Sequence, residues 1–257
     1  MSRWSAKPLR IALAPGEVAL LRARGTPASR VLTTPERTAA SLLPLLDEAL
    51  ADPDWHSQRV EVVLSQHFVR HVLTPPPGKA LSHIEERALV VASLREIYGD
   101  TVDQWSVQVI SQPPQYGLVG AAIDTSLVQQ LDALLARHGF RDVHIRPLAS
   151  VAARRLPNRI QGWWVLAEPG WLSLFGMQNG AWQHVAAQPS DEGWAAALPE
   201  LIEREAGLAT LPTPPTVWLQ GAGVGTVSAP ATGNGHWQVL PHDNRIQGAL
   251  ALAGMDP

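Results

Sequence analysis

Cysteine is absent from the 257 residues of the sequence. Its absence excludes a disulfide framework, a thiol nucleophile and a zinc site with cysteine ligands, and it fits a reducing compartment. The formal net charge is only −3, without the basic stripe that binds nucleic acid. No apolar run approaches the roughly 18 residues of a membrane helix, and the N-terminal segment lacks the apolar core of a signal peptide. We therefore expect a cytoplasmic protein that neither inserts into a membrane nor binds nucleic acid.

Phenylalanine and tyrosine are scarce, numbering 3 and 2, whereas the chain has 10 tryptophans. Successive side chains of a strand point to opposite faces, so Trp163 and Trp164 cannot both face one core. Exposed aromatic groups commonly anchor partners, which makes Trp163, Trp164 and Trp171 candidate partner-binding residues. The alternative is that helices cover both faces of the sheet that carries them.

Residues 163–187 predict three consecutive strands, at 163–167, 171–177 and 182–187. Proline fixes φ and glycine accepts a positive φ, so Pro169-Gly170 predicts a type II turn between the first two strands. Asn179-Gly180 predicts the tight turn before the third. Residues 9–24 are a shorter version of this pattern, with a turn at Pro15-Gly16. Two such copies, far apart in the sequence, predict a duplicated architecture.

The segments between these copies predict a mixed α/β protein. We expect a loop at residues 25–30 and a helix that begins at residues 33–36, where threonines precede a proline and an acid. Ser82 and Glu85 form a capping box for a helix that ends before Gly99. Asp124 has the side chain and position of the cap of a further helix.

This order of elements resembles the actin-like (ribonuclease H-like) ATPase fold, in which a strand-turn-strand hairpin opens each of two halves. In detail it is similar to the PilM-type and MSHA-biogenesis pilus-assembly proteins and to the cytoplasmic domain of the type II secretion L protein. The hairpins at 11–20 and 165–174 lie where that fold has its two phosphate loops. VWLQGAG at 217–223 looks like the strand and glycine turn beside the adenosine, and residues 244–255 resemble the closing helix. The resemblance implies a first-half subdomain at 1–74, an inserted α/β subdomain at 75–150 and a second-half subdomain at 151–257.

The two turns depart from the phosphate loops that they resemble. In nucleotide-binding members each loop carries Asp-x-Gly, whose carboxylate holds the metal or its water. Here Ala14 replaces the first carboxylate, and Glu168 is followed by Pro169, which has no N–H to donate. Because phosphoryl transfer depends on positioned metal and donors, we expect no hydrolysis, weak or absent ATP binding and no required cofactor. If ATP with Mg²⁺ is still bound, the resemblance places it against these residues: Gly16, Glu168, Gly170, Gly221 and Gly223.

The resemblance implies a non-catalytic scaffold of a type IV pilus or type II secretion-like assembly platform. Such a scaffold is recruited to the inner face of the inner membrane by a cytoplasmic peptide of a membrane partner, or by the assembly ATPase, through main-chain pairing and an apolar pocket. The alternative is a nucleotide-binding ATPase or switch of the same family, with Glu168 serving the metal. A sugar kinase or hydrolase on this fold lacks the catalytic aspartate that it would need.

Two further patterns favour ordinary structural roles. His67 and His71 have the spacing of helical metal ligands, but on the predicted strand they would lie about 13 Å apart. Without a third ligand we expect them to be surface or edge histidines. The glycines at 221–225 follow a strand as in a dinucleotide loop, but no periodic helix follows them to complete a Rossmann unit.

Overall fold

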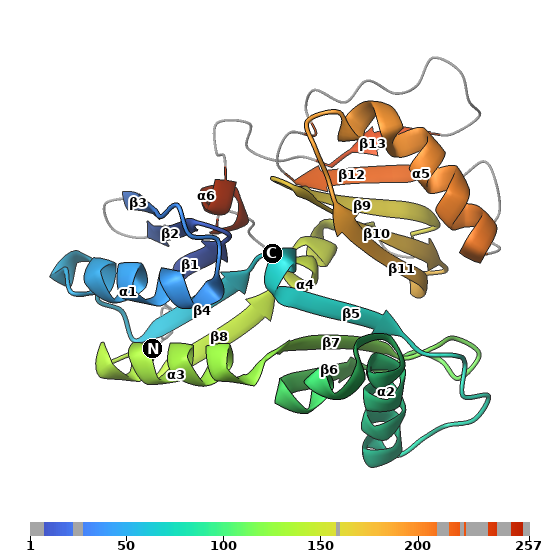
Figure 1. Ribbon diagram of the computed structural model, residues 1–257, viewed down its shortest axis with the longest axis horizontal. Coiled ribbons are helices and arrows are strands. Elements are labelled where there is room, and N and C mark those ends of the chain that lie inside the picture. Colours follow the sequence, from blue (N-terminus) through green and yellow to red (C-terminus); the bar gives the residue numbers. More distant parts are fainter. Residues whose placement is uncertain are drawn as a thin grey trace, which may run out of the picture. The chain divides into compact units, whose positions relative to one another are not determined.

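The computed structural model describes residues 8–22, 28–157, 160–209, 216–221, 224, 236–240 and 248–253. The chain divides into two compact units. The first comprises Met1–Val69, Asp124–Arg154 and Arg245–Pro257, and the second comprises Arg70–Ile123 and Arg155–Asn244. In each unit the chain forms a five-stranded mixed sheet (Figure 1).

The sheet of the first unit has the strand order β3-β2-β1-β4-β8. Its strands are β1 (Leu9–Ala14), β2 (Glu17–Arg22), β3 (Ala28–Thr33), β4 (Arg59–Leu64) and β8 (Asp142–Pro147). β1, β2 and β3 form an antiparallel meander, and β4 and β8 continue the sheet in parallel with β1. The buried strands are rich in Val, Leu, Ile and Ala, as expected where helices cover both faces of a sheet.

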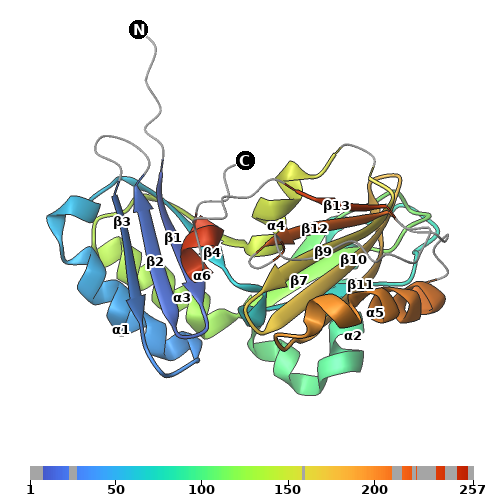
Figure 2. The same ribbon diagram turned by 90° about the horizontal axis from the view of Figure 1, so that it is seen from above.

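Helices cover this first sheet on both faces (Figures 1 and 2). α1 and α3 lie side by side on one face, and α6 lies against β1 and β2 on the other. The helical segments are α1 (Ala39–Leu50), α3 (Thr125–Arg137), α4 (Leu148–Ala152), α6 (Gly248–Ala253) and the short turns η1 (Pro53–Trp55), η2 (Gln66–Phe68) and η4 (Ala153–Arg155). Four leucines of α1 and α3 face the core and are fully buried: Leu42, Leu46, Leu131 and Leu135.

The sheet of the second unit has the order β11-β10-β9-β12-β13. Its strands are β9 (Gly162–Glu168), β10 (Trp171–Gln178), β11 (Ala181–Pro189), β12 (Val217–Gly221) and β13 (Trp237–Val239). β9, β10 and β11 again form an antiparallel meander, and β12 and β13 run parallel to β9. The two sheets therefore share one connectivity, which confirms the predicted duplication and the actin-like fold class.

The two faces of the second sheet are covered by different elements. α5 (Trp194–Ala209) packs on one face, where Trp163, Leu174 and Leu219 meet Leu198 and Ile202. The other face packs against a three-stranded sheet of order β5-β7-β6. α2 packs on the opposite face of that three-stranded sheet. These elements are β5 (Val69–Leu73), β6 (Trp105–Ile110), β7 (Val119–Asp124), α2 (His83–Tyr98) and the turn η3 (Gly99–Gln104).

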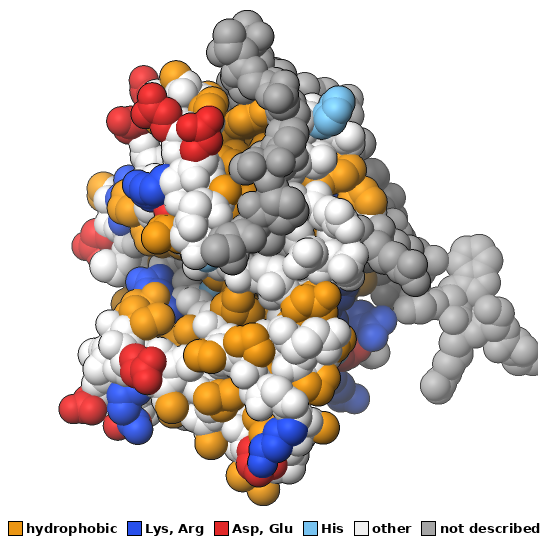
Figure 3. All heavy atoms as spheres, turned by 90° about the vertical axis from the view of Figure 1, so that its right-hand side faces the viewer, with side chains coloured by type: hydrophobic (Ala, Val, Ile, Leu, Met, Phe, Trp, Pro, Cys, Tyr) orange, Lys and Arg blue, Asp and Glu red, His pale blue; other side chains and the backbone are white. Residues whose placement is uncertain are grey.

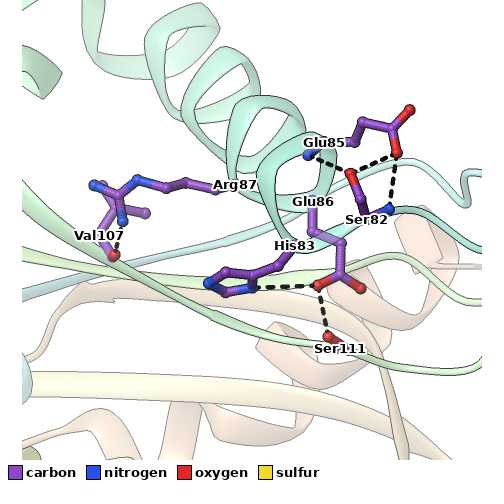
Figure 4. A network of polar contacts seen from close by, with 7 residues as sticks. All are labelled: Ser82, His83, Glu85, Glu86, Arg87, Val107 and Ser111. Atoms are coloured by element: carbon purple, nitrogen blue, oxygen red, sulfur yellow. Dashed lines mark hydrogen bonds and ion pairs between the residues drawn. The ribbon is translucent and has the colours of Figure 1, made fainter.

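The first turn of α2 shows how the sequence fixes a helix start (Figure 4). The Ser82 hydroxyl accepts a hydrogen bond from the amide of Glu85, while the Glu85 carboxylate accepts from the amide of Ser82 at 2.8 Å, as the predicted capping box requires. Glu86 accepts a hydrogen bond from the Ser111 hydroxyl at 2.8 Å, which ties this turn to the segment after β6. The Asp124 cap of α3 is likewise confirmed, with its carboxylate accepting from the amides of Ser126 and Leu127.

The predicted turns are confirmed by their backbone angles. Gly16 and Gly170 have φ of +79° and +77°, the positive values that the third residue of a type II turn needs. Asn179 and Gly180 have φ of +52° and +77°, so both central residues of that turn are left-handed, as in a type I′ hairpin.

Two predictions about residues 25–36 were wrong. Residues 28–30 belong to strand β3 rather than to a loop, because an edge strand can alternate half-buried and exposed polar residues without an apolar run. The following helix begins at Ala39, where the Thr38 hydroxyl accepts from the amide of Ser41 at 3.3 Å. The threonines at 33 and 34 do not cap it, and the Thr34 amide donates instead to the carbonyl of Gly16 at 2.9 Å.

Within the described ranges, no helix combines the length and the apolar composition needed to cross a lipid bilayer.

Candidate functional site

The first hairpin turn, Ala14 to Glu17, is enclosed by its own unit. Gly16 is buried, and its carbonyl oxygen accepts a hydrogen bond from the Thr34 amide at 2.9 Å. A Cβ added at Gly16 would lie 2.8 Å from the carbonyl oxygen of Thr34. Glycine is therefore required here by the positive φ and by the segment that lies over the turn, independently of any phosphate.

The carboxylate nearest to this turn is already engaged. Glu17 follows Gly16 directly, and its Oε1 accepts a hydrogen bond from the amide of Ala249 at 2.6 Å. A Cβ added at Gly248 would lie 2.5 Å from the same carboxylate, so the start of α6 fits closely around it. Glu17 thus serves the first turn of α6, where an anionic group is favoured.

The second turn, Glu168 to Trp171, lies in a different environment. Pro169 and Gly170 are exposed, and the Gly170 carbonyl accepts from the amide of Ser190 at 3.1 Å. The Glu168 side chain is buried, with 4% of the residue exposed. The second turn therefore retains a carboxylate and an accessible glycine, which the first turn does not offer.

Gly221 of the predicted adenosine turn has a structural reason to be glycine. Its φ is +119°, and a Cβ there would lie 2.0 Å from the carbonyl oxygen of Ala167 on the neighbouring strand β9. This close approach of two backbones is sufficient to exclude every other residue. Gly223, the remaining predicted nucleotide-binding residue, lies outside the described residues.

Trp163 and Trp164 point to opposite faces of the second sheet, as predicted, and both are 0% exposed. Trp163 packs under α5. Trp164 stacks on Phe175 with 4.6 Å between ring centroids and donates its indole N–H to Gln220 at 3.1 Å. Both faces of the second sheet are therefore covered, as in the alternative given above. α5 covers the face of Trp163, and the three-stranded sheet covers the face of Trp164. Trp171, beside the exposed turn, is half-buried.

His71 lies in an aromatic cluster that sequence reasoning did not find. It is on the edge strand β5 as predicted, but its ring packs edge-on against Phe175 at 5.9 Å and lies 6.2 Å from Trp182. Burial lowers the pKa of His71 to about 4, so the ring is neutral at pH 7. The prediction that His67 shares this strand was wrong, because His67 is in η2, which ends before β5 begins. Among the described residues no group of acidic and histidine side chains could hold a metal ion.

A groove of about 440 Å³ between α5 and the end of β11 was not predicted. Its apolar lining comes from Leu172, Trp194, Ala197 and Leu201. The remaining lining residues are polar or proline: Gln188, Pro189, Ser190, Asp191, Glu200 and Arg204. The sequence signal that could have found it is the side of α5 on which Glu200 and Arg204 accompany small and apolar residues.

A polar network closes one side of this groove. The buried Glu205 carboxylate accepts from Arg204 at 2.8 Å and pairs with His184 of β11 at 2.7 Å. Burial alone would raise the pKa of Glu205, but the hydrogen bonds from Arg204 and His184 outweigh it and hold the pKa below its usual value. Arg204 also donates to Gln188 at 3.1 Å, so this network joins α5 to the edge strand of the sheet.

No protein-family model matches the chain, and a search of curated proteins returns no match. Solved structures, by contrast, match most of it. The cytoplasmic domain of EpsL, an inner-membrane component of the type II secretion system of Vibrio cholerae, has a TM-score of 0.59 at 16% identity, covering 95% of this chain and 92% of that one. The PilM–PilN type IV pilus biogenesis complex has a TM-score of 0.53 at 15% identity, covering 97% and 99%.

A third structure extends the comparison beyond secretion and pilus proteins. A Bacteroides thetaiotaomicron protein described as having an actin-like ATPase fold and unknown function has a TM-score of 0.53 at 10% identity, covering 87% of this chain and 85% of that one. The duplicated sheets and these similarities together define an actin-like ATPase fold. More particularly, it is the form of that fold seen in the EpsL cytoplasmic domain and in the PilM–PilN complex, as the sequence resemblance predicted.

Proposed function

We propose that this chain is a non-catalytic scaffold of a type IV pilus or type II secretion-like assembly platform. The observation that carries the proposal is the state of the first hairpin turn. Ala14 stands where a nucleotide-binding loop has its carboxylate, Pro15 has no N–H, and Gly16 is buried beneath Thr34. The adjacent carboxylate, Glu17, is occupied by the start of α6.

These features oppose ATP hydrolysis for a physical reason. Mg²⁺ prefers carboxylate and phosphate oxygens, and phosphoryl transfer needs the metal and several N–H donors held in place. A turn whose glycine is buried, and which lacks both the carboxylate and one donor, does not fit a metal–nucleotide complex. The glycine at 221 adds no support for nucleotide binding, because the approach of Ala167 already explains it.

The scaffold role is supported by two proteins of similar structure. EpsL is an inner-membrane component of a secretion system, and PilM forms a complex with PilN in pilus biogenesis. By analogy, this chain works at the cytoplasmic face of the inner membrane and binds a cytoplasmic segment of an inner-membrane assembly protein, or the assembly ATPase. Of the three predicted contact residues, Trp171 is the half-buried one, and contact through Trp163 or Trp164 requires one of the covering layers to move.

A second candidate function is a nucleotide-binding switch. It is favoured by the second turn, where Glu168 keeps a carboxylate directly before the exposed Pro169 and Gly170. In that case Glu168 would hold Mg²⁺ of bound ATP.

Titration calorimetry with ATP and Mg²⁺, paired with a thermal-shift scan, separates the two candidates. A ligand at a hundred times its dissociation constant stabilises a fold by about 2.7 kcal/mol, which is readily seen. The scaffold proposal expects neither heat nor shift at millimolar nucleotide. Magnesium-dependent binding that is lost in Glu168→Ala would establish the switch instead.

The partner is tested by crosslinking the tagged chain in its native cells and identifying what it carries from the membrane fraction. We expect an inner-membrane pilus or secretion protein, or the assembly ATPase. Recovery of the chain without any such protein would contradict the scaffold role, whatever the outcome with nucleotide.

A further inference from the structure

The outer edge of β11 is a nine-residue strand edge in the second unit. Among the described residues, β10 is its one strand partner, so the other side of β11, except at Trp182, has backbone groups that can pair with an added strand. One position shows how such pairing works. Gln112 accepts from the Trp182 amide at 2.6 Å and donates to the Trp182 carbonyl at 3.1 Å, as a residue of a neighbouring strand would.

The groove of about 440 Å³ lies at the other end of the same strand. Gln188 and Pro189 of β11 form part of its lining, and Leu172, Trp194 and Leu201 give it an apolar floor. A strand added beside β11 would send alternate side chains to the α5 side of the sheet. One of those side chains can enter the groove while the backbone pairs with the edge.

The charge of the groove is negative. Asp191 and Glu200 line it and are exposed, and neither forms an ion pair with any described residue. Arg204, the one basic lining residue, is engaged by Glu205 and Gln188. Acidic side chains gather over α5 in the space-filling view (Figure 3). The groove therefore favours a cationic ligand.

One polar atom of the lining supports the same location. The Ser190 hydroxyl is buried without a hydrogen-bond partner among the described residues. An unsatisfied buried group costs free energy, and a ligand that pairs with it removes that cost.

We propose that the β11 edge and the α5 groove bind an extended basic peptide segment. Its backbone pairs with β11 as a sixth strand, an apolar side chain enters the groove between Leu172 and Trp194, and Lys or Arg side chains pair with Asp191 and Glu200. This inference rests on the proposed scaffold function. Cytoplasmic segments beside membrane helices are enriched in Lys and Arg, so the membrane partner supplies the chemistry that this surface fits.

The groove of about 440 Å³ between α1 and α3 is a weaker candidate. Its charged residues, Asp47 and Arg137, pair with each other at 3.0 Å and leave no charge to select a ligand. The surface at β11 differs because main-chain pairing, an apolar anchor and charge all point to one kind of occupant.

The test uses a fluorescein-labelled peptide in which every second residue is serine and the positions between them are lysine or valine, so that lysines and valines lie on one face of the added strand. It is acetylated and amidated and is used with the full chain at physiological salt. Fluorescence anisotropy should report saturable binding. A peptide with glutamate in place of lysine should bind about tenfold more weakly or not at all. N-methylation of alternate amides on one edge, which removes the donors for strand pairing, should weaken binding by about tenfold as well.

Variants of α5 provide matched controls. Ala197 lines the groove and is exposed, so Ala197→Trp should fill it and weaken peptide binding by about tenfold. Ala196→Trp adds the same side chain one residue away, outside the groove lining, and should bind as the native chain does. Glu200→Lys should weaken binding more than Glu203→Lys, because Glu203 does not line the groove.

The outcomes separate this inference from the scaffold function. Absence of binding, equal binding of the N-methylated peptide, or equal loss in Ala196→Trp and Ala197→Trp would overturn the proposed surface. If native crosslinking recovers a membrane assembly protein equally well with Ala197→Trp, the scaffold function stands and this surface is wrong. If no assembly protein is recovered while the peptide still binds as described, the scaffold function fails and the surface remains.

Discussion

The two hairpins of this chain have the same turn and opposite surroundings. Pro15-Gly16 and Pro169-Gly170 have nearly equal glycine angles, and each joins the first two strands of a sheet with the same connectivity. Yet Gly16 is buried under Thr34, whereas Gly170 is exposed. A turn motif is therefore fixed by the geometry of the hairpin, and only its surroundings decide whether a ligand can reach it.

The strands around the turns differ in the same way. Arg10 and Trp164 each lie five residues before their turn proline. Arg10 faces Glu61 of β4 across 3.5 Å, forming a buried ion pair. Trp164 is paired in register with Trp218 of β12 and stacks on Phe175. One backbone plan thus accommodates an ionic pair in one copy and aromatic packing in the other.

The largest expected effect comes from the aromatic copy. Trp164→Ala removes a fully buried indole and the hydrogen bond that it donates to Gln220 Oε1. We expect a loss of about 3–5 kcal/mol in the free energy of unfolding, measured by urea denaturation. Trp164→Phe keeps the stacking on Phe175 and should lose less. Equal losses in the two variants would show that packing contributes little here.

The turns themselves give the sharpest comparison. Gly16→Ala places a Cβ 2.8 Å from Thr34 O at a positive φ, and should cost about 2–3 kcal/mol. Gly170→Ala meets a similar φ in an exposed turn and should cost about 1 kcal/mol. Thermal unfolding of both variants measures the difference. If Gly170→Ala proves as costly as Gly16→Ala, the distinction between a covered and an open turn is mistaken.

Acid sensitivity should belong to the unit of the second hairpin. The pKa of His71 is lowered from 6.5 to about 4. Between these pH values His71 is therefore protonated in the unfolded chain and neutral in the folded state. Stability due to this group is present above pH 6.5 and is lost as the pH falls towards 4, by no more than about 3 kcal/mol.

His71→Phe keeps an aromatic ring against Trp182 and cannot bind a proton. The native chain and the variant share the carboxylates whose pKa values are lowered, such as Asp47 and Glu205. The difference between the stability–pH curves of the native chain and the variant therefore reports on His71. Parallel curves from pH 7 to pH 4 would mean that His71 does not titrate differently in the folded state.

The smallest expected effect concerns the carboxylate of the first hairpin. Glu17→Ala removes the acceptor of the Ala249 amide and the negative charge at the start of α6, at a cost of about 1 kcal/mol. Hydrogen exchange should speed up at the α6 amides before it does elsewhere. Unchanged protection of α6 would show that apolar packing on β1 and β2 holds this helix without Glu17.

Local rules predicted the parts of the fold that depend on neighbouring residues. The Pro-Gly and Asn-Gly turns, the Ser82–Glu85 capping box and the Asp124 cap all satisfy backbone groups within a few residues. The start of α1 was misplaced because several threonines precede it, and Thr38, rather than Thr33 or Thr34, caps the helix. The Thr34 amide instead forms a tertiary hydrogen bond to Gly16, a contact that local rules do not predict.

The candidate site was less predictable for a related reason. That Trp163 and Trp164 point apart follows from strand geometry, but the burial of both depends on a three-stranded sheet from residues 69–124 packing on the second one. His71 gave no sequence signal of its aromatic surroundings. The groove beside β11 depends on where α5 leaves the sheet uncovered. The division of the chain at residues 74 and 150 into three subdomains remains a prediction.

The contact between Glu17 and Ala249 joins residues 232 positions apart. A ribosome that adds about 5–20 residues per second completes that interval in about 10–50 s. Throughout this time the first hairpin exists without the helix that covers one of its faces. Newly made chains therefore carry an incompletely covered apolar sheet until Ala249 has been translated, and termination within that interval should produce fragments that bind chaperones or aggregate.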